Sequence, residues 1–417
     1  MSFLMDALIT TYASLFCMNE RRRSLQMSAK VHAPPSRRPA PCKKPTRLTL
    51  HDRMRALIGD IITEEELVQR LTFGRVLGTG ATSTVYEALD TATGHRVSVK
   101  VFDKASMVEA RRSMVADGQC APEKAVHRVR RRLVKLVSEL EISKSLDHPN
   151  IVKWLGAFET SHRICIVHEL VEGSDLLEHL LEHGKMAEDQ AARVFKQLLA
   201  ALEYCHQRHI FHRDLKLENV MITKDLDVKL IDFGLSEAVA DAQQTLKTAC
   251  GTPLYCSPEI LFLHSSVEIT RKGFYGGPAD VWGVGVMIFA LLTGCAPFDD
   301  SDFERLRREV SRNRIKYPTY ISNPAKWLLK HVLVADAQVR PTVTDMLSYD
   351  WFQDPIHSNS SMTIIDHQQE RMTAEVLREQ LGIEQPPAAL DFDICCDVMS
   401  CRRTSASAGT CSSSASL

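Results

Sequence analysis

The chain has almost no net charge, since 51 Lys and Arg residues offset 52 Asp and Glu residues over 417 positions. Nucleic acid is bound through strongly basic surfaces, so this balance gives no reason to expect a nucleic-acid partner. The 25% of charged and 44% of hydrophobic residues are typical of an ordinary soluble globular protein.

Metal-binding cysteine motifs and a secretory signal are also missing. The twelve cysteines do not stand at the spacings of zinc ligands. Residues 1–18 are apolar, but they lack a positively charged n-region and include Asp6, which argues against a cleaved signal and against a membrane span. We therefore expect reduced thiols and a cytoplasmic location, with the nucleus as the alternative. Membrane contact by residues 1–18 is the weaker alternative to a docking or frayed helix.

Apolar residues are scarce near both ends. The segment 28–47 is rich in proline and basic residues, which predicts a disordered linker. After about residue 352 the chain becomes polar, so the tail 353–417 is expected to be largely disordered. Basic charge is local, with nine Lys and Arg against two acids in residues 1–50, and eight against two in residues 111–135.

Between these flanks the pattern changes from strands to helices. Apolar residues that alternate with others predict strands over 71–80, 83–89, 95–102 and 163–170. Spacings of three and four predict one long helix through Val126, Val129, Leu133, Leu136 and Leu140. Two more long helices are predicted over 191–206 and 279–294.

Several short motifs follow one another in a fixed order. The stretch "LGTGATSTV" is a weak signal alone, because glycines between strands occur in many hairpins. It precedes Lys100, which is flanked by valines in "VSVK". Further on, "HRDLKLEN" precedes "DFG" with eighteen residues from Asp214 to Asp232, and "CGTPLYCSPE" ends at Glu259. Motifs in this order are hard to obtain by chance.

This order resembles the eukaryotic protein kinase family. The resemblance covers residues 71–352. It implies a bilobal α+β fold, with a small strand-rich N-lobe (71–168), a hinge (169–173) and a larger helical C-lobe (174–352). Residues 1–70 are then an N-terminal extension, partly disordered and basic.

Two details resemble the serine/threonine type. One is "HRDLKLEN" with Lys216, and the other is Thr252, at the position where such kinases bridge Asp214 and Lys216. The segments around "CGTPLYCSPE" and "DVWGVGV" are most similar to the calcium/calmodulin-dependent and AMP-activated kinase-like group. No EF-hand loop is found in the sequence, so direct calcium control is not expected.

The resemblance implies ATP as the phosphate donor. Gly78 and Gly80 let backbone N–H groups approach its phosphates, which a Cβ would obstruct. Lys100 contacts the α- and β-phosphates and is held by a helix glutamate, either Glu139 or Glu141. Counting back nine residues from the histidine of "HPNIV" selects Glu139. The other implied nucleotide-binding residues are Leu77, Val85, Ser98, Glu169, Val171, Asp175 and Met221.

The implied catalytic residues use charge and position to move a phosphoryl group. Asp214 accepts a hydrogen bond from the substrate hydroxyl, and Lys216 neutralises charge on the moving phosphate. Asp232 and Asn219 bind Mg²⁺. The alternative is a pseudokinase scaffold that binds nucleotide and partners without transferring phosphate.

The resemblance also implies regulation and substrate choice. A phosphate on Thr248, added by an upstream activating kinase, would pair with Arg213, and Thr245 is the alternative phosphorylation site. Glu218 and Asp175 match positions that hold basic residues, so the protein substrates are expected to show a moderate preference for upstream arginine.

Besides mild departures from the family pattern, such as Ser83 for the third glycine of the loop, three departures cluster. His168 replaces a bulky apolar residue before the hinge, Ser143 replaces an apolar residue of the helix, and Trp154 replaces a medium-sized aliphatic residue. We hypothesise that Trp154 fills the space that Ser143 leaves, because a void there would cost roughly a few kcal/mol.

Other predictions concern neighbours and flanks. His212 should support Phe233, Arg340 should pair with Glu259, and Trp282 and Phe289 should be core residues. The basic insert 104–132 is interpreted as a solvated loop with the first helical turns, or else as a docking or phosphate-sensing element. Ser24, Thr404 and Ser405 follow basic pairs, which predicts phosphorylation there, unless the arginines only add charge.

Overall fold

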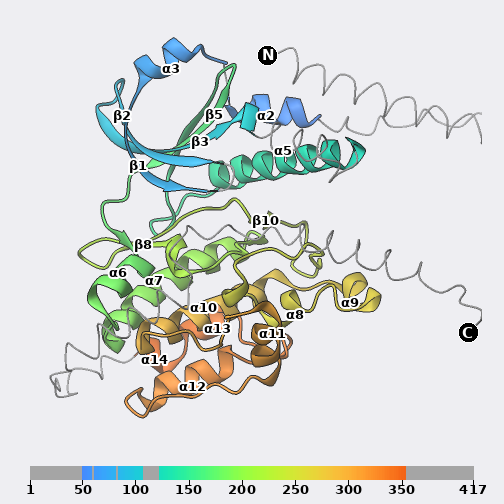
Figure 1. The fold of residues 1–417 in the computed structure, drawn as a ribbon. Helices are drawn as coiled ribbons and strands as arrows, with labels where there is room; N and C mark the ends of the chain where they lie inside the picture. The colour runs from blue at the N-terminus through green and yellow to red at the C-terminus, as the bar shows by residue number, and fades with distance from the viewer. Residues whose placement is uncertain (1–48, 59–60, 81–82, 107–121, 354–417) are drawn as a thin grey trace, which may run out of the picture.

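In a computed structural model the chain forms two lobes, with the sheet of the smaller lobe above the helices of the larger one in Figure 1. The structure describes residues 49–58, 61–80, 83–106 and 122–353. Several predictions lie outside the described residues, namely the linker 28–47, the tail beyond 353, residues 107–121 of the basic insert, and phosphorylation of Ser24, Thr404 and Ser405.

The smaller lobe is built on one antiparallel sheet. In spatial order its strands are β1 (Leu71–Thr79), β2 (Thr84–Asp90), β3 (His95–Asp103), β5 (Arg163–Glu169) and β4 (Trp154–Glu159). The four strands that the alternation predicts are confirmed. The register places Val85 opposite Lys100, and Ser98 opposite His168.

A long helix, α5 (Pro122–Ser145), lies against this sheet (Figure 1). Leu133, Leu136 and Leu140 are buried with Phe102 of the sheet, as their spacing predicts. The helix begins at Pro122, and proline suits the first turn of a helix because its missing N–H has no partner there. The end of the basic insert therefore forms the first turns of α5.

Two helices that the sequence analysis does not predict precede β1. They are α2 (Leu50–Ile58) and α3 (Glu64–Arg70). A threonine precedes each helix and forms a capping box with the acid three residues on, Thr49 with Asp52 and Thr63 with Glu66. The backbone N–H of the threonine donates to the carboxylate, and the threonine hydroxyl accepts the backbone N–H of the acid. Leu67 of α3 is fully buried among apolar side chains of the sheet. The extension is thus packed onto the smaller lobe from residue 49 onward, apart from residues 59–60.

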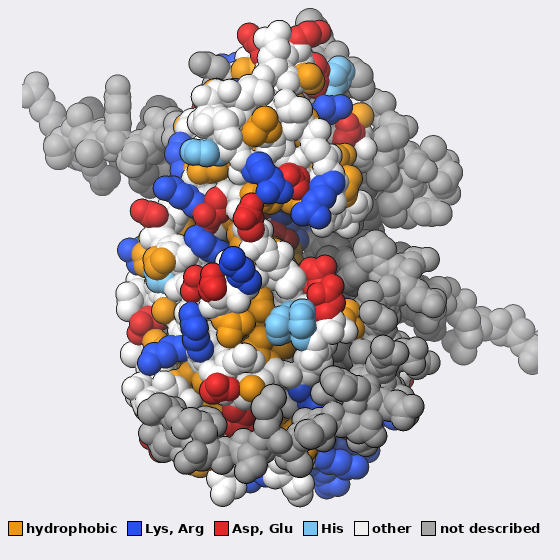
Figure 2. Space-filling view, turned by 90° about the vertical axis from the view of Figure 1, so that its left-hand side faces the viewer, with side chains coloured by type: hydrophobic (Ala, Val, Ile, Leu, Met, Phe, Trp, Pro, Cys, Tyr) orange, Lys and Arg blue, Asp and Glu red, His pale blue; other side chains and the backbone are white. Residues whose placement is uncertain are grey.

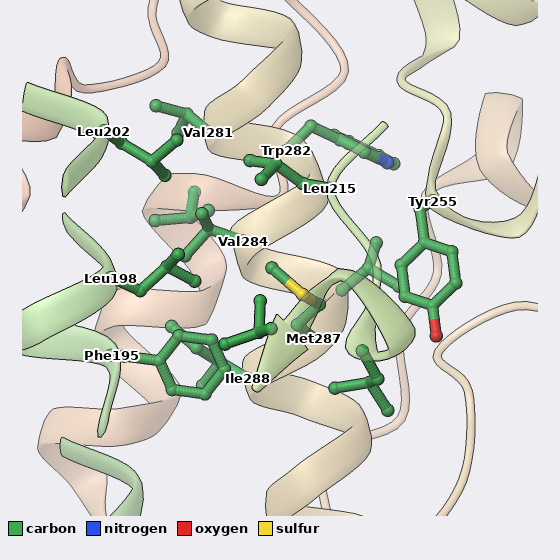
Figure 3. Close-up of a cluster of buried hydrophobic side chains, with 14 of the residues drawn as sticks. Phe195, Leu198, Leu202, Leu215, Tyr255, Val281, Trp282, Val284, Met287 and Ile288 are labelled. Carbon is green, nitrogen blue, oxygen red and sulfur yellow. The ribbon is translucent and has the colours of Figure 1, made fainter. Parts of the chain in front are cut away.

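The larger lobe packs around α10 (Gly276–Thr293). Figure 3 shows side chains of α10 against Leu198 of α7 (Glu188–His206). Trp282 and Phe289 are buried, as predicted. By length and composition α10 could cross a membrane, but 89% of it is buried inside the lobe, as in the core helix of a globular domain.

Two small antiparallel sheets position the loops near the boundary of the lobes. One pairs β7 (Ile210–Phe211) with β10 (Glu237–Ala238), and the other contains β6 (Ser174–Asp175), β8 (Val220–Ile222) and β9 (Val228–Leu230). "HRDLKLEN" therefore joins β7 to β8, and "DFG" follows β9.

Further helices complete the larger lobe. They are α6 (Leu176–His183), α8 (Pro258–Leu261), α9 (Val267–Lys272), α11 (Phe303–Arg312), α12 (Asn323–Val332), α13 (Val343–Leu347) and α14 (Asp350–Gln353), with the 3-10 turns η1 (Leu217–Asn219) and η2 (Pro253–Tyr255). On the face in Figure 2, basic and acidic side chains are interspersed with hydrophobic ones. Among the described side chains of this face no broad region of one charge is visible, which fits the balanced composition.

Candidate active site

Lys100 links the two lobes through two carboxylates. Its Nζ lies 2.7 Å from Oε1 of Glu139 on α5 and 2.8 Å from Oδ1 of Asp232. Burial alone would lower the pKa of Lys100, but the two carboxylates raise it far above its ordinary value. Loss of solvent would raise the pKa of Asp232, but Lys100 holds it well below its usual range. The lysine is therefore charged, and Asp232 is a carboxylate at neutral pH.

Gly234 leaves room for this group of charges. A Cβ at this position would lie 3.1 Å from Oδ1 of Asp232, 3.3 Å from Oε2 of Glu139 and 3.4 Å from Nζ of Lys100. The absence of a side chain in "DFG" thus lets the backbone approach the ion pairs closely.

Asp214 is held in the loop between β7 and β8 by bonds to both of its carboxylate oxygens. Oδ1 accepts hydrogen bonds from the backbone N–H of Thr252, at 3.0 Å, and from its hydroxyl, at 3.1 Å. Oδ2 accepts one from Nδ2 of Asn219, at 3.1 Å, and lies 3.8 Å from Nζ of Lys216. The orientation of the carboxylate is therefore fixed before a substrate arrives.

Asp280, which is buried on α10, anchors the same loop. Its two oxygens accept the backbone N–H groups of His212, at 2.9 Å, and of Arg213, at 2.8 Å. Nε2 of His206 lies 2.9 Å from it, and despite burial, which acts in the other direction, this contact lowers the pKa of Asp280. No role for Asp280 is predicted from the sequence, although a single acid within a long apolar helix is a readable signal.

His212 supports the "DFG" segment, as predicted. Its ring packs against that of Phe233 at 5.1 Å between centroids. Its Nδ1 accepts the backbone N–H of Asp214 at 3.3 Å, so Nε2 carries the proton and donates to the carbonyl of Ile231 at 3.1 Å. The imidazole is thus fully used in shaping the loop and does not serve as an acid or base.

The strand side of the expected nucleotide site is assembled by sheet register. Gly78 of β1 pairs with Val85 of β2, which in turn pairs with Lys100. The backbone N–H of Gly80 donates to the carbonyl of Ser83 at 2.8 Å and closes the turn between the strands. Leu77, beside Gly78, is exposed.

The hinge side is ordered by hydrogen bonds. The hydroxyl of Ser98 donates to the backbone carbonyl of Glu169 at 3.1 Å, and Nζ of Lys229 lies 2.6 Å from the Glu169 carboxylate. Asp175 caps α6 by accepting two backbone N–H groups, and it pairs in the sheet with Met221. Val171 lies between Glu169 and Asp175 in the hinge and is half-buried.

Two of the three departures from the family pattern pack together. The rings of Trp154 and His168 meet edge to face at 5.8 Å, and Trp154 also packs against the cluster under α5. Burial, assisted by the charge of Lys100, lowers the pKa of His168 to about 4, so this ring is neutral. Ser143 is buried. That Trp154 fills the space left by Ser143 stays a hypothesis.

Arg213 already has partners in the segment that contains Thr248. It donates from Nη1 to the carboxylate of Glu237, from Nη2 to the backbone carbonyl of Thr248 at 3.0 Å, and from Nε to Sγ of Cys250 at 3.1 Å. Thr248 is exposed, whereas Thr245 is half-buried. Sequence reasoning missed Glu237, because its approach to Arg213 depends on how the strand β10 pairs with β7.

Asp232 and Asn219 offer the oxygen ligands that Mg²⁺ prefers. Nδ2 of Asn219 donates to the backbone carbonyl of Asp214 at 2.8 Å and to its carboxylate, so the amide oxygen of Asn219 is left for a cation. With Asp232 ionised, the two residues fit the Mg²⁺-binding role that the resemblance implies.

The predicted pair of Arg340 and Glu259 stabilises the larger lobe. The guanidinium makes two bonds of 2.7 Å to the carboxylate and also donates to the carbonyl of Pro278. Its side chain is fully buried. The pair is confirmed and lies apart from the site.

Comparison with known proteins agrees with this geometry. A family model described as the protein kinase domain matches residues 71–352. The chain is 31% identical to the SNF1-related protein kinase catalytic subunit alpha KIN12 of Arabidopsis thaliana. The alignment extends over 312 residues, which are 74% of this chain and 57% of that protein. It is also 34% identical to CBL-interacting protein kinase 32 of Oryza sativa subsp. japonica over 288 residues. These residues are 69% of this chain and 59% of that protein. The chain thus spans less than two thirds of the length of these relatives.

Proposed function

The chain belongs to the protein kinase domain family, and from this premise we propose that it is an active serine/threonine protein kinase. It transfers the γ-phosphate of ATP to Ser or Thr hydroxyls of protein substrates. One observation carries the proposal: Lys100 is bonded to both Glu139 and Asp232, while Asp214 is held by Thr252 and Asn219. A scaffold that only binds partners has no chemical need for both arrangements.

In the proposed reaction the substrate hydroxyl oxygen attacks the γ-phosphorus of ATP. An oxygen–phosphorus bond forms, and the bond from the γ-phosphorus to the bridging oxygen of the β-phosphate breaks, so that ADP leaves. Asp214 accepts the hydrogen bond of the hydroxyl, orients it and takes its proton. Lys216, 3.8 Å from Asp214, offsets the negative charge on the moving phosphoryl group.

The nucleotide is held by both lobes in this proposal. Lys100, positioned by Glu139, binds the α- and β-phosphates, and the N–H groups around Gly78 and Gly80 bind the phosphates from above. Asp232 and Asn219 would hold Mg²⁺, which would neutralise part of the phosphate charge. The side chains of Leu77, Val85, Ser98 and Met221 contact the adenine, the backbone of Glu169 and Val171 binds its edge, and Asp175 binds the ribose.

We also propose that phosphorylation of Thr248 raises activity. Support comes from the exposure of Thr248 and from the bond between its backbone carbonyl and Arg213, the residue before Asp214. The guanidinium is paired with Glu237 when Thr248 carries no phosphate. A phosphate on Thr248 must therefore replace the Glu237 carboxylate as the partner of Arg213, and this limits the increase in activity that phosphorylation brings.

A moderate preference for arginine a few positions upstream of the target completes the proposal. The side chain of Glu218 is 25% exposed, and its Oε1 lies 3.8 Å from Nζ of Lys216. A cationic side chain of a bound peptide would pair with the exposed part of this carboxylate. A peptide array tests this preference. Indifference to upstream arginine, or a requirement for proline after the target, counts against it.

The experiment for the proposed function measures transfer of labelled phosphate from ATP–Mg²⁺ to a generic basic protein. Lys100→Met and Asp232→Ala should each abolish transfer in a protein that still folds, as its circular dichroism would show. A wild-type protein that binds ATP but transfers nothing would favour the pseudokinase scaffold instead.

A further inference from the structure

We infer that helix α2 is a built-in clamp that holds α5, and with it Glu139, in the position that catalysis requires. Arg53 is the positioning residue of this clamp. The inference rests on the proposed kinase function. It concerns residues 49–58 and 61–62, which precede the region 71–352 that the family model matches, so the family resemblance does not account for them.

An ion pair joins the two helices. Nε of Arg53 donates to Oε1 of Glu141 at 2.8 Å, and Nη2 donates to Oε2 of the same carboxylate. Two parallel bonds between a planar guanidinium and a carboxylate fix direction as well as distance. Both side chains are about one third exposed, so replacing either one does not leave a cavity in the core.

The geometry of α5 gives this pair its meaning. Glu139 and Glu141 are two residues apart, which is a rotation of about 200° around a helix, so they point to opposite sides. Glu139 faces inward, 2.7 Å from Lys100, while Glu141 faces outward to Arg53. Of the two glutamates that compete for Lys100 in the sequence, one binds the lysine and the other binds the clamp.

Apolar contacts add to the ion pair. The residues of α2 that face α5 recur at helical spacing, and they pack on the cluster that contains Leu133, Leu136 and Leu140; they are Leu50, Met54, Leu57 and Ile58. Ile58 is only 6% exposed. Figure 1 shows α2, in blue, lying beside the teal helix α5. Outward movement of α5 would expose this apolar surface.

The clamp is itself tied to the sheet. After α2, the backbone N–H of Ile62 donates to the carbonyl of Glu159 at the end of β4, at 2.9 Å, and Ile61 forms a β-bridge with the same residue. Because α2 is fixed at this end, its contacts with α5 oppose separation of Glu139 from Lys100. Kinase activity depends on that ion pair, so the clamp acts on the rate through α5.

The test uses the full-length chain and a charge swap. We expect Arg53→Glu and Glu141→Arg each to lower kcat about tenfold. The double variant Arg53→Glu with Glu141→Arg should recover kcat to within about threefold of wild type, because it restores the pair with reversed charges. Arg70→Glu is the matched control, since Arg70 pairs with Asp90 at 3.3 Å and does not contact α5 in this way. Its kcat should stay within about twofold of wild type.

Hydrogen exchange of the α5 amides gives a second readout that needs no activity. Exchange around Glu139 should be faster in Arg53→Glu than in wild type and should return to normal in the charge swap. The inference is overturned if an active wild type and Arg53→Glu show equal kcat and equal α5 exchange, or if the swap recovers neither. If the wild type transfers no phosphate while α5 exchange still responds to the swap, the proposed function fails and the clamp stands as a structural contact only.

Discussion

The guanidinium of Arg213 donates a hydrogen bond to the carboxylate of Glu237, in the place where a phosphate on Thr248 would have to bind. The arginine side chain is 4% exposed and that of Glu237 is 43% exposed. A buried cation therefore has an anionic partner before any phosphorylation. The loop that carries Asp214 is held in part by this pair.

Glu237→Gln should lower the kcat of the unphosphorylated protein about threefold to tenfold, because Arg213 is left with neutral partners only. Phosphorylation of Thr248 should then give a larger gain in the variant than in wild type. Turnover before and after treatment with an activating kinase measures both effects. Glu309→Gln is the control, because Glu309 pairs with Arg312 on the surface at 3.9 Å. Equal gains in wild type and Glu237→Gln would contradict the exchange of anions.

Gly234→Ala should reduce kcat/KM about a hundredfold with little change in melting temperature. The added Cβ would meet Asp232, Glu139 and Lys100 at 3.1 to 3.4 Å and displace their ion pairs. Gly156→Ala is the matched control, because a Cβ there meets nothing within 4 Å. Steady-state kinetics of both variants check the prediction, and near wild-type kinetics for Gly234→Ala would refute it.

His168 should make the protein less stable in mild acid. Its pKa is lowered from 6.5 to about 4 in the folded state, first by burial and then by Lys100. Between these values the unfolded chain binds the proton and the folded chain does not, so stability is lost as the pH falls. Between about pH 7.5 and about pH 5 the loss amounts to about 2 kcal/mol.

His168→Leu should remove this part of the pH dependence. Urea unfolding at the two pH values, in wild type and in His168→Leu, measures it. His264→Leu, at an exposed position, serves as the control. The same pH dependence in wild type and His168→Leu would show that His168 does not cause the loss.

Arg340→Leu should destabilise the larger lobe by about 3–5 kcal/mol, because it leaves the carboxylate of Glu259 without its partner. The Glu259 side chain is 18% exposed and that of Arg340 is fully buried. Arg305→Leu, which breaks the exposed pair with Asp299 at 2.8 Å, should cost under about 1 kcal/mol. Chemical unfolding of the two variants gives the comparison, and similar losses would be inconsistent with a buried role for Arg340.

The sequence predicts the site better than its surroundings. Lys100, Asp214 and Asp232 can be placed because each stands in a short motif that ties a residue type to one chemical role. The bonds from Asp280 to the loop, or from Arg213 to Glu237, depend on contacts between distant segments, and no local pattern carries them.

Helix α2 was missed for a related reason. It follows a polar, proline-rich stretch and is only nine residues long, so its few apolar residues give a weak period. Its stability comes from contacts with α5, and its arginine pairs across 88 positions in the sequence. The local signal that could have found it is the capping pair of Thr49 and Asp52 before an apolar face.

The most direct test of the whole account compares wild type and Asp214→Asn for phosphate transfer and for nucleotide binding. Asp214 meets the substrate hydroxyl and not ATP in the proposed reaction. The account predicts that wild type transfers phosphate from ATP–Mg²⁺ to a basic protein, and that Asp214→Asn loses about 10³-fold of this rate while binding ATP as tightly as wild type. Turnover by Asp214→Asn close to that of wild type would contradict it.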